Sequence, residues 1–184
     1  MIITITGKPC SGKGTVSKLF CEKFNFEYIC TGDMFRAFAK EFGYNSVLEF
    51  QQQYKNIHEV DKLIDDKTAE IGKTRFNENI VIDSRLAWNF VPNSFKIFID
   101  VSWHEAGKRL MNANRSNEKA KNAKEAAKIL KERWQVENER YKKLYGTSNL
   151  DFNNYNLVIS SDNLTPEEIS EMIYNEYKKF MQKA

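Results

Sequence analysis

A segment near the N-terminus combines glycines, a lysine and a hydroxyl in an order suited to binding phosphate. It reads Gly7-Lys8-Pro9-Cys10-Ser11-Gly12-Lys13-Gly14-Thr15. This order matches the pattern G-x-x-x-x-G-K, followed by Gly-Thr. Gly7 and Gly12 permit backbone torsions that a side chain would obstruct, so successive N–H groups can surround phosphate oxygens at the positive end of a helix. Lys13 adds a full positive charge for the terminal phosphates of a nucleotide.

The residue after the lysine departs from the general pattern. Such loops usually carry Ser or Thr there, whereas this chain has Gly14 and places Thr15 one position later. The Thr15 hydroxyl is then the candidate to lie near a metal ion or the phosphates. The shift favours kinases of nucleoside monophosphates over GTPases and ATPases. An ordinary glycine-containing turn is the alternative, but the loop, the lysine and the flanking elements agree on phosphate binding.

Arginines after the fourth expected strand could supply more positive charge to transferring phosphates. They are Arg109, Arg115, Arg133 and Arg140. Phosphoryl transfer needs positioning and charge more than covalent chemistry. The spacing of Arg133 and Arg140 predicts that both lie on one face of a helix, two turns apart. The alternative is a solvated helix of Lys, Glu and Arg, which the composition of residues 117–143 would produce by itself.

Alternating strands and helices must position these residues. Short apolar, β-branched segments alternate with longer helical patterns, as in βαβ units around a parallel sheet. We expect strands at residues 2–6, 26–30, 80–82, 96–101 and 157–159, and helices at 13–24, 33–42, 46–73, within 103–146, and after Thr165. The nearly continuous apolar strands suit a sheet covered on both faces. The last helix has the clearest beginning, because Thr165 and Glu168 form a capping box around Pro166.

Length and patterning predict one domain, residues 1–184, with two helical inserts. The core would comprise residues 1–30, 76–111 and 147–184. The first insert covers residues from about 31 to 75, where Val60, Leu63, Ile64 and Ile71 predict a buried stripe. The second covers residues from about 112 to 146.

Composition excludes several classes of protein. A hydrophobic fraction of 41% is enough for a core, and the net charge of +3 is too small and too dispersed to predict a nucleic-acid partner. Cys10, Cys21 and Cys30 form no CxxC pair or zinc set, so reduced thiols in a reducing compartment are expected. The first apolar run is too short for a signal peptide, and no run approaches the roughly 20 residues of a membrane helix. We therefore expect a cytoplasmic protein, without a membrane partner, and a monomer.

Two segments resemble the adenylate kinases. Residues 7–15 are similar to the loop G-x-P-G-S-G-K-G-T, with Cys10 in place of the middle glycine. Residues 31–37, Thr-Gly-Asp-Met-Phe-Arg-Ala, resemble the T-G-D-M-x-R-A segment of the monophosphate site. Taken whole, the chain resembles the short archaeal-type cytidylate kinases. The further matches lie in residues 59–62, 81–86, 139–142, 144–146 and 155–159.

The resemblance implies an α/β fold of the P-loop NTPase class. It implies a doubly wound, five-stranded parallel sheet with an NMP-binding insert at about 31–75 and a short helical lid at about 112–146. The lid would close over ATP, which enters with Mg²⁺.

Residue roles follow from the same resemblance. ATP would contact residues 7–15, Arg109 and Arg115. Of these, Arg109 could stack on adenine. The acceptor nucleotide would contact Thr31, Gly32, Asp33, Arg36, Asp61 and Arg85. Asp83 would hold Mg²⁺ through water, near the Thr15 hydroxyl. Lys13, Arg85, Arg133 and Arg140 would act on the transferring phosphoryl group.

Several functions remain open at this point. The preferred function is the transfer of phosphate from ATP to CMP or dCMP. One alternative is an adenylate kinase-like enzyme. Another is a P-loop phosphotransferase that acts on a hydroxylated metabolite, with Asp33 as base. A nucleic-acid-binding module is disfavoured by the weak net charge. Trp88 could line the acceptor pocket. The Asp65-Asp66 pair is expected to be exposed, although the resemblance also implies that Asp61 and Asp65 contact the sugar or base of the acceptor.

Overall fold

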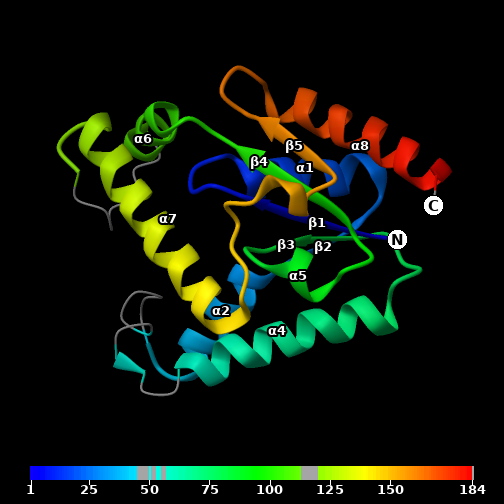
Figure 1. The fold of residues 1–184 in the computed structure, drawn as a ribbon, viewed down its shortest axis with the longest axis horizontal. Coiled ribbons are helices and arrows are strands. Elements are labelled where there is room, and N and C mark those ends of the chain that lie inside the picture. The colour runs from blue at the N-terminus through cyan, green and yellow to red at the C-terminus, as the bar shows by residue number, and fades with distance from the viewer. Residues whose placement is uncertain (45–49, 51–52, 55–56, 113–119, 184) are drawn as a thin grey trace.

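The computed structural model describes residues 1–44, 50, 53–54, 57–112 and 120–183. A five-stranded sheet forms its centre, with helices on both faces (Figure 1). The strands are β1 (Ile2–Gly7), β2 (Glu27–Cys30), β3 (Ile80–Asp83), β4 (Phe95–Asp100) and β5 (Leu157–Ser160). All five predicted strands are therefore confirmed, with small differences at their ends.

The sheet has the order β2-β3-β1-β4-β5, and every pair of neighbouring strands is parallel. Ile5 of β1 pairs with Asp83 of β3, and Gly7 pairs with Ile99 of β4. The chain thus leaves β1 toward one edge of the sheet and returns later to build the other edge. A crevice opens where the strand order reverses, at the carboxyl end of the central strand. The phosphate loop begins at this point.

The helices cover the two faces of the sheet in different ways. They are α1 (Lys13–Phe24), α2 (Thr31–Glu41), α4 (Ile57–Thr74), α5 (Ala87–Phe90), α6 (Trp103–Asn112), α7 (Ala123–Tyr145) and α8 (Pro166–Lys183), with the 3₁₀ turn η1 (Phe152–Asn154). Helices α1 and α8 pack together on one face, where Phe20 and Ile173 meet the apolar residues of β1 and β4. On the other face, Ile80 and Ile82 pack against α5, and Phe98 packs near Trp134 of α7. Burial of the strands on both faces explains their continuous apolar sequence.

The ends of the two longest C-terminal helices follow from their sequence. Asn122 accepts a hydrogen bond from the Glu125 amide at 3.0 Å and so caps α7. The capping box of α8 is confirmed, because the Thr165 amide donates to Glu168 at 2.7 Å and the Glu168 amide donates to the Thr165 hydroxyl at 3.2 Å. Each of these hydrogen bonds satisfies a backbone N–H group that the helix itself leaves unpaired at its first turn.

Helix α4 carries a narrower apolar stripe than the sequence predicts. Val60 and Ile64 are buried against α2 and Phe50, whereas Leu63 is 42% exposed. The prediction for Leu63 was wrong because α4 contacts its neighbours along one side only, and Leu63 lies outside the i, i+4 line of Val60 and Ile64. In Figure 1 this helix runs along the opposite side of the molecule from α8.

Candidate phosphate-transfer site

The loop between β1 and α1 has the backbone geometry of a phosphate cradle. Gly12 has φ +84°, a left-handed conformation that favours glycine. A Cβ at Gly7 would collide with the carbonyl oxygen of Ile99 and come within 2.8 Å of Ser11 Oγ. Glycine is therefore required by the close contacts at Gly7 and favoured by the backbone conformation at Gly12, as the sequence predicts, and the loop delivers its N–H groups to the start of α1.

Cys10 is a second left-handed residue in this loop, with φ +60°. A left-handed conformation costs a non-glycine residue roughly 1–2 kcal/mol. The Cys10 side chain packs against the apolar cluster between α6 and α7, which contains Val101, Leu110 and Leu130. This packing offsets part of the backbone cost. The left-handed conformation also agrees with the glycine that the related loops carry at this position.

Lys13 and Asp83 form the centre of the site. Lys13 Nζ contacts Asp83 Oδ1, and Tyr28 Oη donates to Asp83 Oδ2 at 3.0 Å. Asp83 is only 3% exposed. Burial lowers the pKa of Lys13 below its ordinary value, and the charge of Arg85 adds to this effect, whereas the adjacent carboxylate favours the charged form. Phosphate oxygens beside Lys13 would likewise favour its charged form.

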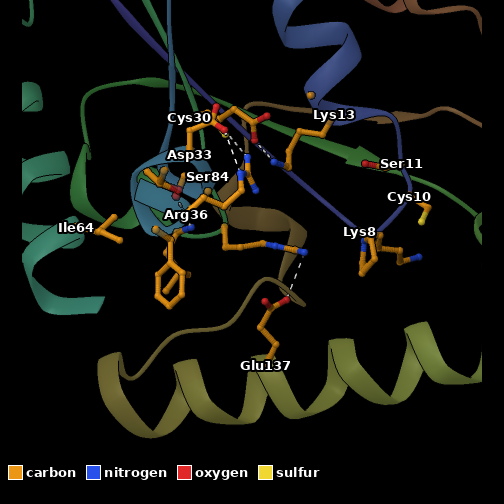
Figure 2. Close-up of a pocket in the computed structure, with 18 of the residues that line it drawn as sticks. Lys8, Cys10, Ser11, Lys13, Cys30, Asp33, Arg36, Ile64, Ser84 and Glu137 are labelled. Atoms are coloured by element: carbon orange, nitrogen blue, oxygen red, sulfur yellow. Dashed lines mark hydrogen bonds and ion pairs between the residues drawn. The ribbon is translucent and has the colours of Figure 1, made fainter. Parts of the chain in front are cut away.

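Arg85 reaches the phosphate loop from the segment after β3. Its guanidinium donates to the Gly7 carbonyl oxygen at 3.3 Å and pairs with Glu137 of α7 at 3.3 Å. It also lies 5.7 Å from the ring centre of Trp134. Figure 2 shows Glu137 directed from its helix toward this side of the loop. The contact joins the core of the sheet to the helix that the sequence assigns to the lid.

Arg36 and Asp33 lie beside the end of β2, in the first turns of α2. Their side chains are paired at 2.5 Å, and both are exposed. The hydrogen bond from Arg36 lowers the pKa of Asp33. Figure 2 places the pair next to Cys30 and on the same side of the loop as Lys13.

Two further polar pairs connect α4 to α7. Arg140 lies 3.5 Å from Asp61 Oδ2, and Tyr145 Oη donates to Asp65 Oδ2 at 2.5 Å. Burial raises the pKa of Asp61, while Arg140 opposes this shift. Burial also raises the pKa of Asp65, to about 6, against the hydrogen bond from Tyr145. The carboxylates of Asp61 and Asp65 are thus held where α4 faces the C-terminal part of α7.

One cavity of about 1200 Å³ joins these groups. Of the residues predicted to take part, it is lined by Lys8 through Thr15, Thr31, Gly32, Asp33, Arg36, Asp61, Asp83, Arg85, Arg133 and Arg140. The predicted helical face of Arg133 and Arg140 is confirmed, because both line the cavity from α7. Arg115 lies outside the described residues.

Arg109 lies beside the phosphate loop but outside the residues that line the cavity. Its guanidinium donates to the Ser161 carbonyl oxygen at 2.6 Å, to Ser161 Oγ at 3.0 Å and to the Cys10 carbonyl oxygen at 3.4 Å. An ion pair with Glu105 at 3.2 Å fixes its orientation. Helix α6 thus directs the guanidinium across the gap between the loop and the end of β5. Stacking of Arg109 on adenine stays a prediction.

Trp88 does not line the cavity, contrary to one of the expectations. Its indole Nε1 donates to Asn149 Oδ1 at 2.8 Å, and Tyr155 Oη donates to the same oxygen at 3.0 Å. Trp88 is 5% exposed. Satisfying the indole N–H in the interior turns the side chain away from the site.

Several residues that line the cavity were not assigned to it from the sequence, among them Tyr28, Glu137 and Tyr145. Asp65, which the residue pattern predicted to be exposed and the resemblance placed near the acceptor, is half-buried and lines the cavity. Glu137 is four residues after Arg133 and three before Arg140, so helical spacing could have identified it. Asp65 follows Asp61 by four residues and shares its face, whereas Asp66 is exposed as expected. Tyr28 carries no local signal, because its contact with Asp83 spans 55 residues of sequence.

The oxygen atoms near Lys13 suit a hard cation that keeps most of its water. Asp83 and Thr15 both line the cavity, and Mg²⁺ commonly takes one or two protein oxygens, with waters and phosphate oxygens completing its shell. Within the described ranges there is no cluster of three His, Cys, Asp or Glu side chains that could hold a metal without a nucleotide. Asp83 and Thr15 therefore fit a magnesium ion that arrives with a nucleotide. Separately, none of the described helices is both long and apolar enough to cross a membrane.

Comparisons with known proteins agree with this arrangement. The sequence profile of the Cytidylate kinase-like family matches residues 2–163. The cytidylate kinase of Methanocaldococcus jannaschii is 32% identical over 94% of this chain and 95% of its own, and that of Methanobrevibacter smithii is 33% identical over 97% and 99%.

Two other similarities are informative in different ways. The S-adenosylmethionine-dependent nucleotide dehydratase of Lacinutrix mariniflava is 36% identical over 96% of this chain, which spans 36% of the length of that relative. The shikimate kinase of Bacteroides thetaiotaomicron superposes with a TM-score of 0.68 at 17% identity, over 97% of this chain and 98% of its own. At that identity the likeness shows the fold alone, that of a P-loop kinase. With the family match extending over most of the residues that build the site, the chain belongs to the cytidylate kinase-like family.

Proposed function

We propose that this protein transfers the γ-phosphoryl group of ATP to CMP or dCMP, producing ADP and CDP or dCDP. One observation carries the proposal: a single cavity contains the phosphate loop and a second set of basic side chains opposite it. The loop with Lys13 suits the triphosphate. Arg36 and Arg85 suit a second phosphate that approaches from the side of α2.

The chemistry follows from the charges in the cavity. An oxygen of the acceptor phosphate attacks the γ-phosphorus of ATP, and the bond to the β-phosphate oxygen breaks. The acceptor is already an anion, so the protein need not supply a base. Lys13, Arg85, Arg133 and Arg140 would stabilise the charge on the transferring group. On nucleotide binding, these cations would exchange their contacts with carboxylates such as Asp83 and Glu137 for contacts with phosphate oxygens.

Asp83 and Thr15 would hold the magnesium ion, which neutralises charge on the β- and γ-phosphates when bound. The segment at about 31–75 would act as the acceptor insert and the segment at about 112–146 as the lid. Closure of the two would exclude water from the transfer. A monomer that works in a reducing, cytoplasmic setting remains the expectation from the sequence.

Cytidine nucleotides are favoured over other acceptors by the named relatives. Two cytidylate kinases match nearly their whole length to this chain. The Lacinutrix relative has a different name, so the acceptor requires a direct test. An adenylate kinase-like preference stays the alternative because of residues 31–37. A metabolite kinase with Asp33 as base is less favourable, since the hydrogen bond from Arg36 lowers the pKa of that carboxyl and a base for a neutral hydroxyl needs a higher one.

A panel of acceptors tests the proposal. Steady-state rates with MgATP would be measured for CMP, dCMP, UMP, AMP, GMP and shikimate. We expect the highest kcat/KM for CMP or dCMP. A preference for AMP of tenfold or more would overturn the choice of acceptor, and phosphorylation of shikimate alone would overturn the assignment to nucleotides.

A further inference from the structure

A second cavity, of about 280 Å³, lies beside the phosphate loop, between the start of α6, the middle of α7 and the segment that leads into η1. Of the described residues, Lys8 alone lines both this cavity and the larger one. The volume is just below the roughly 300–1,000 Å³ of typical ligand pockets. A molecule with one aromatic ring therefore suits this cavity, whereas a nucleotide is too large for it.

Aromatic side chains form most of the wall of this cavity. Phe98 and Trp134 are buried, with ring centres 6.2 Å apart. The ring centre of Phe152 lies 5.0 Å from that of Phe98, yet Phe152 remains 45% exposed. Trp103 lines the cavity from the first residue of α6. Rings placed in this way offer faces and edges on which a further aromatic ring would pack favourably.

A buried hydrogen-bond donor without a partner also belongs to this cavity. Asn149 lines the cavity and is fully buried. Its Oδ1 accepts hydrogen bonds from Trp88 and Tyr155, neither of which lines the cavity. Its Nδ2 has no hydrogen-bond partner in the described part of the chain, and such a buried donor is costly to leave unpaired. A water molecule could accept from Nδ2 but would not cover the aromatic wall, so a ligand with a ring and an acceptor atom fits better.

The charges around the cavity favour an anion. Lys8 and Lys131 line it, and none of the described lining residues is acidic. Lys8 Nζ lies 2.6 Å from Asp100 Oδ1 and donates to the Val101 carbonyl oxygen at 3.2 Å. An ammonium group has three donors, so one N–H of Lys8 is left for a ligand. A carboxylate would accept hydrogen bonds from these donors and would match the positive charge.

We propose that this cavity is a second binding site, for a small aromatic carboxylate. The ring would pack on Phe98, Trp103 and Trp134, and the carboxylate oxygens would accept hydrogen bonds from Asn149 Nδ2 and the lysine ammonium groups. The bound molecule would touch the phosphate loop through Lys8 without entering the nucleotide cavity. The inference is independent of the proposed function, because it concerns a different cavity and does not depend on the acceptor.

Benzoate is the probe, and benzamide, which has nearly the same shape but no charge, is its matched control. Binding to the full chain would be followed by NMR, through the side-chain N–H signals of Asn149, Trp103 and Trp134. We expect saturable shifts of these signals, with a Kd for benzoate of about 10 mM or lower, since about nine non-hydrogen atoms reach that value at modest ligand efficiency. Benzamide should bind about twofold to fivefold more weakly. The same shifts should appear in saturating MgADP, which would occupy the phosphate loop.

Two exposed positions allow the site to be altered with little risk to the fold. Lys131→Met should weaken benzoate binding about twofold to fivefold and leave benzamide binding unchanged, because it removes only an exposed charge. Lys128→Met is its control, three residues earlier on α7 and outside the cavity. Phe152→Ala should weaken the binding of both probes at least about threefold through lost ring packing. Phe76→Ala is the control for that variant, since Phe76 is exposed and lines neither cavity.

Three results would overturn the inference. Shifts confined to the phosphate loop and abolished by MgADP would mean that benzoate binds only as an anion on that loop. Shifts that do not saturate would mean that the cavity has no specific affinity for the probe. Equal weakening of benzoate binding by Lys131→Met and Lys128→Met would mean that the charge at the cavity plays no part.

Discussion

The Tyr28 hydroxyl donates a 3.0 Å hydrogen bond to Asp83 Oδ2 while Lys13 holds the other oxygen of the same carboxylate. Three elements thus meet at one buried group: β2, β3 and the start of α1. Gly14 lies against this pair, because a Cβ there would stand at ordinary contact distance, 3.5 Å from Asp83 Oδ2 and 4.0 Å from Tyr28 Oη.

Removing this hydroxyl should weaken the positioning of Asp83. In Tyr28→Phe we expect kcat to fall about tenfold, because a hydrogen bond to a charged group is worth roughly 1.5–3 kcal/mol. We also expect a rise in the Mg²⁺ concentration that gives half-maximal nucleotide binding. Nucleotide binding would be titrated by fluorescence at several Mg²⁺ concentrations, beside the kinetics. Tyr174→Phe is the control, since Tyr174 stacks on Phe24 away from the site. A Mg²⁺ dependence identical to that of the wild type would contradict the positioning role.

Under the proposed function, Glu137 would compete with the acceptor phosphate for Arg85. The two side chains pair at 3.3 Å and are 18% and 27% exposed. In Glu137→Gln we expect the KM for the acceptor to fall about twofold to fivefold, because the guanidinium no longer has to leave a charged partner. Glu132→Gln, on the exposed side of α7, should leave KM unchanged. An increase in KM in Glu137→Gln would show instead that the carboxylate supports the closed state.

The loop should accept glycine at position 10 but no side chain at position 12. Cys10 contributes its backbone to the cradle, so Cys10→Gly should keep kcat within about twofold, with relief of left-handed strain set against lost packing. Gly12→Ala places a side chain at φ +84° and should lower both ATP affinity and the free energy of unfolding, the latter by about 1 kcal/mol or more. Calorimetric titration with ATP and thermal unfolding would measure both. Loss of ATP binding in Cys10→Gly would mean that the thiol itself contributes to the site.

Asp65 makes folding stability depend on pH in a direction that can be worked out. Its pKa is raised from 3.8 to about 6, mainly by burial. The folded state therefore holds this proton more tightly than the unfolded state, and stability is lost as pH rises from about 4 through about 6. An asparagine at this position has no carboxyl proton to lose, so Asp65→Asn removes this loss of stability. The free energy of unfolding of the variant minus that of the wild type should therefore be larger at pH 7.5 than at pH 5. The increase should be up to about 1 kcal/mol after allowance for solvent screening. Urea unfolding at the two pH values would measure it, and an equal difference at both would contradict the assignment.

Local sequence signals predicted the framework of the fold with little error. The β-branched runs, the glycines of the loop and the capping box at Thr165 each act through neighbours in sequence. They correspond to β1 through β5, to the left-handed Gly12 and to the beginning of α8. The prediction for Leu63 was wrong because the width of the buried face of a helix depends on the elements that pack against it. The periodicity of the helix's own sequence does not reveal those elements.

The site was predicted less completely, for a physical reason. Lys13, Arg36 and Arg85 were identified because their residue types belong to recognisable segments. Tyr28 and Tyr145 reach the cavity through contacts with carboxylates 55 and 80 residues away. Such contacts depend on how the sheet orders its strands and on where α4 crosses α7. Trp88 shows the reverse case, a residue close to Arg85 in sequence that the fold turns into the core.

Transfer of labelled phosphate in Lys13→Met tests the central claim most directly. The claim is that the loop and Lys13 stabilise the transferring phosphoryl group in a cavity shared with a nucleoside monophosphate. With γ-labelled ATP and CMP, the wild type should form labelled CDP, and Lys13→Met should do so slower by a factor on the order of 10³ or more while remaining folded. A loss smaller than tenfold in a folded variant, or no labelled CDP from the wild type, would contradict it.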